Sequence, residues 1–273
     1  MTGRPGRLPT SADITAADIT ATDILAGAGI AAGLAALAHA APAVGSWTQL
    51  RRVVVPAFSG VGSPGHLALT FDDGPDPAST PAFLDCLDRL ELRATFFLLG
   101  EQVRRSPGLA KELVERGHEA GVHGDRHTSH LRRPAGWVSR DVRAATDIIA
   151  EATGVAPVWF RPPYGAVAAS SLVAARRAGL RLVLWTCWGR DWRADATPDS
   201  IVTRVERGRR PGATVLLHDS DITSAPGSWT RTLAALPELA ERWRAAGLSV
   251  GTLSDHGIAP PRRLAPGRRG TVQ

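Results

Sequence analysis

The sequence contains very little cysteine and lysine. Its two cysteines, Cys86 in a helical pattern and Cys187 in an apolar strand pattern, are too few for the disulfide framework of a small secreted scaffold. Both have the pattern of small buried apolar residues, so cysteine usage does not identify the cellular compartment. Because Lys111 is the only lysine, the net charge of +6 and the pI near 10.7 come almost wholly from arginine.

The arginines do not form the pattern of a nucleic-acid groove. The sequence has no basic patch interleaved with aromatic residues, and many arginines lie near the two ends of the chain. This distribution is typical of solvated basic tails, so we expect no nucleic-acid partner. The arginines near the ends are Arg4, Arg7, Arg51, Arg52, Arg262, Arg263, Arg268 and Arg269.

The hydrophobic content of 44% and the frequent Gly and Pro breaks exclude a disordered chain and an all-helical coiled coil. A chain of 273 residues is long enough for one sizeable domain with appendages. We expect a leader and linker over residues 1–60, one domain over residues 61–256 and a basic disordered tail over residues 257–273. We expect the protein to be a monomer.

Residues 24–45 contain no Asp, Glu, Lys or Arg and consist mainly of Ala and Gly. A membrane-spanning helix needs about 20 apolar residues, so the segment is long enough, although Ala and Gly contribute little hydrophobicity. We expect a membrane anchor or an export signal here, and a protein that is anchored in the membrane or exported to the cell envelope. A loosely packed helix in a cytoplasmic protein is the alternative.

From residue 65 onward, strand patterns and helix patterns alternate. Repeated strand-then-helix order predicts a parallel sheet with crossover helices, either closed as a barrel or open. Such folds build their sites at the carboxyl ends of the strands. The strand patterns cover residues 65–71, 94–99, 159–161, 180–185, 213–217 and 248–252, and the helix patterns cover 80–90, 108–116, 137–153, 169–178 and 233–246.

Two adjacent carboxylates, Asp72 and Asp73, follow the first strand pattern, and the turn residues Gly74 and Pro75 end it. Successive side chains at a strand end point in opposite directions, so one carboxylate could bind a metal while its neighbour faces a substrate. A surface Asp-Asp-Gly turn is the alternative. Partners elsewhere in the chain decide between the two.

His123 and His127 are four residues apart, the spacing at which side chains meet on a helical turn. Together with one carboxylate they make a three-ligand site with an open position, as hydrolytic metal centres require. A second Asp can then act as general base and a separate His as general acid. Two unrelated surface histidines are the alternative.

Five segments match, in order, the five motifs of a known family. They are Thr70-Phe71-Asp72-Asp73-Gly74, His123 to His127, Arg161-Pro162-Pro163-Tyr164-Gly165, Asp191-Trp192 and Leu216-Leu217-His218. Over roughly residues 65–255 the chain therefore resembles the polysaccharide deacetylase family, also called the NodB-homology or carbohydrate esterase family 4 domain. The resemblance implies an α/β fold, a distorted (β/α) barrel of the NodB-homology type.

The resemblance also implies roles for single residues. Asp73, His123 and His127 would be the metal ligands. Asp72 would be the base that deprotonates the attacking water, and His218 would be the acid that protonates the leaving amine.

Other residues would support these groups. Arg161 would hold Asp72 ionised and oriented, because a nearby guanidinium lowers the pKa of a carboxylate. Asp191 would keep the His218 imidazole charged and oriented. The backbone N–H of Tyr164 would stabilise the oxyanion of the tetrahedral intermediate. The residues expected to contact substrate are Trp192, Leu216 and Pro163.

Two positions depart from the family pattern. Gly124 stands where the family has Ser or Thr, and Thr128 stands where Pro often follows the second histidine ligand. Both changes bear on the rigidity of the loop and on metal affinity, but they leave the ligand set intact. We expect His118 to be structural, whereas His130 has no assigned role.

The function implied by the resemblance is metal-dependent removal of N-acetyl groups from an amino-sugar polysaccharide, either peptidoglycan or a chitin-like glycan. The alternatives are an O-acetyl ester hydrolase of the acetylxylan type, a deacetylase of a small glycoconjugate and a non-catalytic glycan-binding protein. A site of two His and one carboxylate suits zinc, and it also suits cobalt, nickel, manganese or iron. The expected partner is an acetylated glycan.

Overall fold

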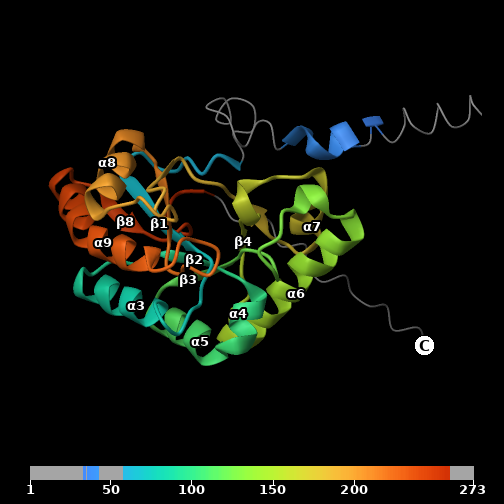
Figure 1. Ribbon diagram of the computed structural model, residues 1–273, viewed down its shortest axis with the longest axis horizontal. Coiled ribbons are helices and arrows are strands. Elements are labelled where there is room, and N and C mark those ends of the chain that lie inside the picture. The colour runs from blue at the N-terminus through green and yellow to red at the C-terminus, as the bar shows by residue number, and fades with distance from the viewer. Residues whose placement is uncertain (1–32, 35, 43–57, 259–273) are drawn as a thin grey trace, which may run out of the picture. The chain divides into compact units, whose positions relative to one another are not determined.

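The structure is a computed structural model, and it describes residues 33–34, 36–42 and 58–258 (Figure 1). The expectations for the leader over residues 1–32, for the linker over 43–57 and for the tail over 259–273 lie outside these residues. Residues 33–34 and 36–42, part of the charge-free segment, are helical. Among the described residues, no helix combines the length and the apolar character needed to cross a membrane.

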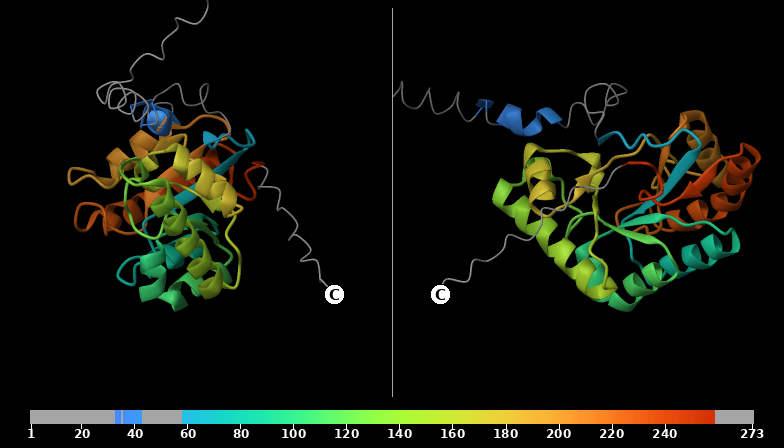
Figure 2. Two further views of the ribbon diagram at one scale, coloured as in Figure 1. Left: turned by 90° about the vertical axis from the view of Figure 1, so that its right-hand side faces the viewer. Right: turned by 180° about the vertical axis from the view of Figure 1, so that it is seen from behind.

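One parallel sheet forms the centre of the domain, and helices surround it (Figures 1 and 2). All recorded strand pairs are parallel, and the strand order is β5-β4-β3-β2-β1-β7-β6, with β8 paired to the beginning of β1. The expected distorted (β/α) barrel is confirmed. The strands are β1 His66–Asp72, β2 Thr95–Leu98, β3 Glu119–Val122, β4 Trp159–Phe160, β5 Arg181–Leu182, β6 Cys187–Trp188, β7 Thr214–His218 and β8 Ser249–Gly251.

The register of the central strands brings their carboxyl ends to one edge of the sheet. Asp72 at the end of β1 lies opposite His218 at the end of β7. Val122, the last residue of β3, lies opposite Phe160, the last residue of β4. The loops that follow β1, β3, β4 and β7 therefore begin side by side, as expected for a site at this edge.

The helices largely follow the predicted pattern. The α-helices of the domain are α3 Thr80–Arg89, α4 Gly100–Arg105, α5 Pro107–Glu115, α6 Ala135–Thr153, α7 Ala169–Arg177, α8 Pro198–Gly208 and α9 Ser228–Ala245. The sequence pattern had not indicated α4, α8, β3 and β6. Three of these elements span six residues or fewer, too few for a periodic pattern, but α8 carries a capping box from Thr197 to Ser200 that signals a helix start.

The two faces of β1 have different surroundings. Phe71 packs on one face against Phe96 and Phe83, with ring centroids 5.0 and 5.2 Å away. On the other face, Ala68 belongs to a second apolar cluster inside the sheet, and Asp72 is on the same face by alternation. The alternation of the strand therefore brings a carboxylate into the interior of the barrel.

The packed region begins before residue 61 and includes His256. The Thr214 hydroxyl donates a hydrogen bond to the Gly60 carbonyl at 2.6 Å, and the Leu184 amide donates to the Phe58 carbonyl at 2.9 Å. His256 is fully buried, with a ring nitrogen 2.8 Å from a ring nitrogen of His66. Cys86 and Cys187 are buried, as expected.

Candidate active site

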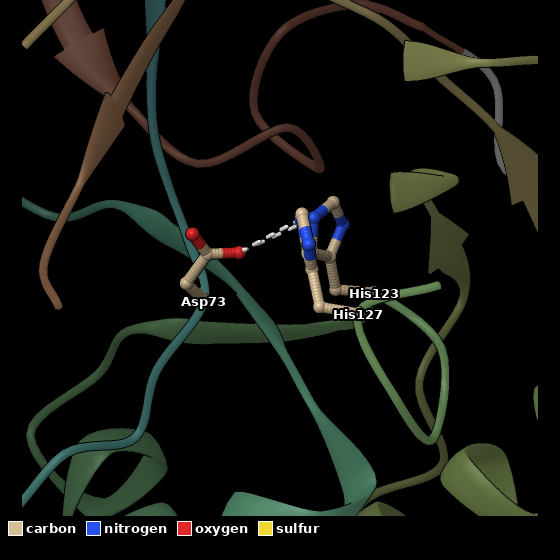
Figure 3. Close-up of side chains that lie close together, drawn as sticks. All are labelled: Asp73, His123 and His127. Carbon is tan, nitrogen blue, oxygen red and sulfur yellow. Dashed lines mark ion pairs between the residues drawn. The ribbon is translucent and has the colours of Figure 1, made fainter. Parts of the chain in front are cut away.

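Asp73, His123 and His127 lie together at the carboxyl edge of the sheet (Figure 3). The Nε2 atoms of both histidines are 3.5 Å from Oδ1 of Asp73. The structure corrects the expectation that the two imidazoles share a helical turn, because residues 123–127 form an irregular loop after β3. The loop turns at Gly124, which has φ +97°, and this turn brings the second histidine back toward Asp73.

The chemistry of these three side chains fits a divalent cation. Oδ1 of Asp73 is buried and has no hydrogen-bond partner among the described residues, which is costly for an acceptor unless a cation occupies the space beside it. Burial lowers the pKa of His123 to about 3 and also lowers the pKa of His127. Both imidazoles are therefore neutral at pH 7, the state in which they bind metal.

Groups outside the ligand set orient the ligands. Nδ1 of His123 is 2.8 Å from the carbonyl oxygen of Arg161, so its Nε2 is the nitrogen directed at Asp73. The Thr223 hydroxyl donates a 2.5 Å hydrogen bond to Oδ2 of Asp73. Sequence reasoning missed Thr223, because it belongs to the loop after β7 and no local pattern links it to Asp73.

Asp72 is the second carboxylate of the pair, and it is buried beside Arg161. Nη1 of Arg161 donates to Oδ1 of Asp72 at 2.7 Å and to the Thr70 hydroxyl at 2.9 Å, while Nη2 donates to the Leu184 carbonyl at 3.1 Å. The guanidinium also lies 4.0 Å from the centroid of the Phe97 ring. These contacts fix the carboxylate, whose Oδ2 is 3.7 Å from Nε2 of His123.

Burial and Arg161 act on the pKa of Asp72 in opposite directions. Desolvation by burial raises the pKa of this carboxyl, and the opposing attraction of Arg161 and His218 does not fully offset the effect. Arg161 does lower the pKa of Asp72, as expected, but burial raises this pKa by more. Sequence reasoning identified the neighbouring cation but not the depth of burial. Arg161 still orients the carboxylate.

His218, partly buried at the end of β7, pairs with the buried Asp191 of the segment after β6. Oδ1 of Asp191 is 2.9 Å from Nδ1 of His218, and Oδ2 accepts the His218 amide N–H at 2.7 Å and the Thr232 hydroxyl at 2.9 Å. Burial alone would lower the pKa of His218, but the charge and the hydrogen bond of Asp191 outweigh it and raise the pKa to about 10. The imidazole is therefore protonated at pH 7 and able to donate a proton.

Asp141 on α6 holds the loop that carries the two histidines. Its Oδ2 accepts the Asp125 amide N–H at 3.0 Å, and its Oδ1 accepts the Arg126 amide N–H at 3.2 Å. A Cβ atom at Gly124 would lie 2.8 Å from Oδ2 of Asp141. The space that a Ser or Thr side chain would need at position 124 is therefore occupied by the carboxylate that holds the loop.

A pocket of about 1070 Å³ opens beside these groups. Asp72, His123, His127 and His218 line it, together with the expected residues Tyr164, Trp192 and Leu216 and several residues of β6 and α8. Pro163, which was expected to contact substrate, is buried and does not line the pocket; it lies beneath the histidine loop near Gly124.

Tyr164 lies at the mouth of the pocket in an unusual backbone conformation. Its φ of 61° is rare for a residue with a side chain, and its ring centroid is 4.3 Å from that of His127. Among the described residues, its amide N–H donates no hydrogen bond to another backbone or side-chain group. An amide in this state can serve as an oxyanion donor.

His118 and His130, the other two histidines considered in the sequence analysis, have structural surroundings. His118 is buried beside Phe96, its Nδ1 accepts the Ala94 amide N–H at 3.3 Å, and burial lowers its pKa to about 4. His130 is fully buried and stacks on Phe160, with Nδ1 3.1 Å from the Ser171 hydroxyl. Neither lines the pocket.

The fold and the site define an α/β barrel whose buried centre is suited to metal-assisted hydrolysis. The chain belongs to the polysaccharide deacetylase family, whose model, described as Polysaccharide deacetylase, matches residues 60–183. The chain is 35% identical over 191 residues to a peptidoglycan-N-acetylglucosamine deacetylase of Bacillus cereus. The aligned region covers 69% of this chain and 86% of that protein.

Other relatives define the extent of the likeness. The peptidoglycan-N-acetylglucosamine deacetylase PgdA of Listeria monocytogenes is 35% identical over 63% of this chain, but the chain spans only 36% of that protein's length. The crystal structure of the Bc1960 peptidoglycan N-acetylglucosamine deacetylase superposes with a TM-score of 0.71 at 28% identity, over 80% of this chain and all of that one. A structure of BA3943, a pseudoenzyme of the same family from Bacillus anthracis, superposes with a TM-score of 0.66 at 25% identity, over 74% of this chain and 68% of that one.

Proposed function

We propose that the protein is a metal-dependent hydrolase that removes N-acetyl groups from an amino-sugar polysaccharide. The observation that carries the proposal is the arrangement of three kinds of group around one pocket. These are a three-ligand set with an orphaned buried oxygen, a separate buried carboxylate, and an imidazole whose pKa is raised to about 10. Amide hydrolysis needs a group of each kind.

Asp73, His123 and His127 would hold the cation. A divalent ion bound there supplies Lewis-acid polarisation of the acyl oxygen and acidifies water. Zinc is the first candidate for a site of two His and one carboxylate, and cobalt, nickel, manganese and iron fit the same donor set. Thr223 holds one oxygen of the Asp73 carboxylate, which leaves the other oxygen directed at the two histidines.

Asp72 would act as the general base. Arg161, which also donates to the Thr70 hydroxyl, holds the Asp72 carboxylate at the pocket, next to the ligand set. The raised pKa of Asp72 makes it a better proton acceptor than an exposed aspartate. It would accept the proton of the water that attacks the acetyl carbonyl.

His218 would act as the general acid, because Asp191 keeps it protonated at neutral pH. It would donate its proton to the leaving amine when the carbon–nitrogen bond breaks. The amide N–H of Tyr164 would stabilise the negative oxygen of the tetrahedral intermediate. Trp192 and Leu216 would contact the acetyl methyl group, since both are apolar residues that line the pocket.

The names of the relatives support an amino-sugar polymer as substrate. They are peptidoglycan-N-acetylglucosamine deacetylases and, in Bradyrhizobium, a chitooligosaccharide deacetylase. A substrate in the cell wall would require a protein that reaches the cell envelope, and this location is part of the proposal. The alternatives, hydrolysis of O-acetyl esters or of small glycoconjugates, use the same groups and differ only in what the pocket accepts.

Acetate release from chitooligosaccharides, peptidoglycan and acetylxylan tests the proposal. We expect release from an N-acetylated substrate that stops in EDTA and returns when zinc or cobalt is added. Release from acetylxylan alone would identify an ester hydrolase. The absence of release from all three substrates, with metal bound, would place the chain with the non-catalytic members of the family.

A further inference from the structure

The pocket continues well beyond the catalytic groups, along β6 and one face of α8. Four arginines line this far part: Arg190, Arg204, Arg207 and Arg210. We refer to them as the arginine cluster. None of the residues that the reaction above requires lies among them. The cluster therefore needs a separate explanation.

The local structure fixes the cluster at the pocket. Arg204 and Arg207 are three residues apart on α8 and share a face of the helix. The opposite face of α8 is buried through Ile201, Val202 and Val205. A Cβ atom at Gly208 would lie 2.9 Å from Cβ of Cys187, so the end of α8 packs closely against β6.

Carboxylates do not neutralise the cluster. Among residues 58–258, none of its four guanidinium groups forms an ion pair. Two arginines nearby that do not line the pocket are paired: Arg193 with Asp195 at 2.7 Å and Arg209 with Glu206 at 2.8 Å. The hydrogen bond from Arg193 is the main cause that lowers the pKa of Asp195, and the charge of Arg204 adds only a small effect. The positive charge facing the pocket is therefore largely uncompensated.

Aromatic rings connect the cluster with the catalytic acid. The guanidinium of Arg190 lies 5.0 Å from the centroid of Trp188, the Trp188 and Trp192 centroids are 4.9 Å apart, and Trp192 is 5.6 Å from the His218 ring. Arg190 has φ 52°, a conformation that costs energy in a residue with a side chain. The site thus has a charged end and a reactive end, separated by rings on which sugars can pack.

We propose that the arginine cluster is a subsite for an oxyanion of the glycan, a carboxylate or a phosphate, carried beside the acetylated sugar. The planar guanidinium matches both groups with paired hydrogen bonds. A pocket lined with one sign of charge also concentrates ligands of the opposite sign. The proposal rests on the proposed function for the reaction, and it specifies the substrate as an anionic rather than a neutral amino-sugar polymer.

The test compares kcat/KM for acetate release on matched oligosaccharides. The first is a peptidoglycan tetrasaccharide with its peptide carboxylates intact, and the second is the same molecule with those carboxylates converted to amides. Chitotetraose and its 6-phosphate provide a second pair, which separates phosphate from carboxylate recognition. We expect the wild-type protein to prefer the charged member of at least one pair. The preference should shrink at high salt, because the Debye length falls from about 10 Å at 0.1 M to about 3 Å at 1 M.

The variant R204Q/R207Q removes two charges from the cluster. We expect the charged-to-neutral ratio of kcat/KM to fall about fivefold, the effect of losing two partly exposed ion pairs. R140Q/R143Q is the matched control: both arginines are exposed, three apart on α6, and outside the pocket. Its ratio should match that of the wild type. R190Q, on a different element, should lower the ratio even if α8 does not tolerate substitution.

A charged-to-neutral ratio of kcat/KM near one in the wild type, for both substrate pairs, would overturn the subsite. An equal fall of this ratio in R204Q/R207Q and in the control R140Q/R143Q would also overturn it. If no substrate releases acetate, the proposed function fails. The subsite is then tested on its own, by measuring the affinity of the same charged and neutral oligosaccharides by calorimetry. Tighter binding of a charged member, weakened by R204Q/R207Q, would retain the subsite as a binding site. Equal binding of both members would overturn it.

Discussion

Two adjacent aspartates acquire different environments because the strand ends between them. Asp72 is the last residue of β1 and keeps the alternation of the strand, so it faces Arg161 in the barrel interior. Asp73 has φ 85° and begins the loop, where its carboxylate meets the two histidines and Thr223. Strand alternation alone was enough to predict that the two side chains diverge. The proximity of Asp73 to His123 and His127 is what makes it, rather than Asp72, the proposed ligand.

The pair of Asp191 and His218 predicts a pH dependence. The proposed mechanism requires protonated His218, so activity should fall as the pH rises through the pKa of that imidazole, about 10 in the folded protein. In D191N the charge that raises this pKa is absent, so the falling limb should move to lower pH by at least about one unit. The pH profile of kcat/KM measures the shift. D147N, an exposed aspartate on α6, is the control, and an unmoved limb in D191N would contradict the assigned role.

Thr223 predicts an effect on metal affinity without contact between threonine and metal. Its hydroxyl fixes Oδ2 of Asp73, so T223V should weaken metal binding about tenfold or more, a usual effect of losing a partner of a ligand. T223S retains the hydroxyl and should recover most of the affinity. Metal titration of the apo protein gives the value. If T223V and the wild type bind metal equally, the threonine does not orient the ligand.

At the scale of elements, α6 and the histidine loop form one unit. Asp141 of α6 accepts two amide N–H groups of the loop, and Gly124 leaves space for its carboxylate. The departure of Gly124 from the family pattern therefore does not imply a loose loop. A helix side chain supplies the hydrogen bonds that hold it.

The contact between Gly124 and Asp141 predicts that placing the family residue Ser at position 124 lowers the stability of the protein. G124S introduces a side chain at φ +97° against the Asp141 carboxylate, and such conformations cost about 1–3 kcal/mol. We expect the urea midpoint of G124S to fall, with an unchanged slope. G136A is the control, because Gly136 lies in α6 with no atom closer than 3.6 Å to an added Cβ. A G124S variant as stable as the wild type would show that the loop adapts.

Some elements could be predicted from the sequence and others could not. The apolar runs of β1, β2 and β7 and the amphipathic patterns of α3, α6 and α7 are local signals, and all appear near the expected positions. The two-residue strand β6 has no such signal. β6 is a strand only because it pairs with β7, and β7 is too distant in sequence for a local pattern to reveal the pairing.

At the scale of the whole molecule, the end of the barrel depends on His256. Its ring contacts His66 and the Gly212 carbonyl, and its backbone carbonyl accepts the Ser63 amide N–H at 2.9 Å. A chain ending at residue 254 leaves these buried groups without partners, so we expect a loss of about 2 kcal/mol or more in the free energy of unfolding. A chain ending at residue 258 should match the full protein. Urea unfolding compares the three, and equal stability of the shortest chain would contradict the importance of this closure.

Much of the site could be predicted because its chemistry lies in short motifs at strand ends. Asp73, His123, His127, Asp72 and His218 converge because parallel strands end at one edge. What the sequence could not reveal depends on distant contacts or on burial. Thr223 is 150 positions from the aspartate it holds, and the raised pKa of Asp72 results from desolvation that no local pattern encodes.

The central claim is that neighbouring carboxylates divide metal binding and proton transfer between them. Metal content and acetate release, measured together on the variants D73A, H127A and D72N, test it most directly. We expect D73A and H127A to lose the bound metal and the activity. D72N should keep the metal and lose about 10²–10⁴-fold in kcat, the usual contribution of a general base. A D72N variant with full activity, or a D73A variant with full metal content, would contradict the account.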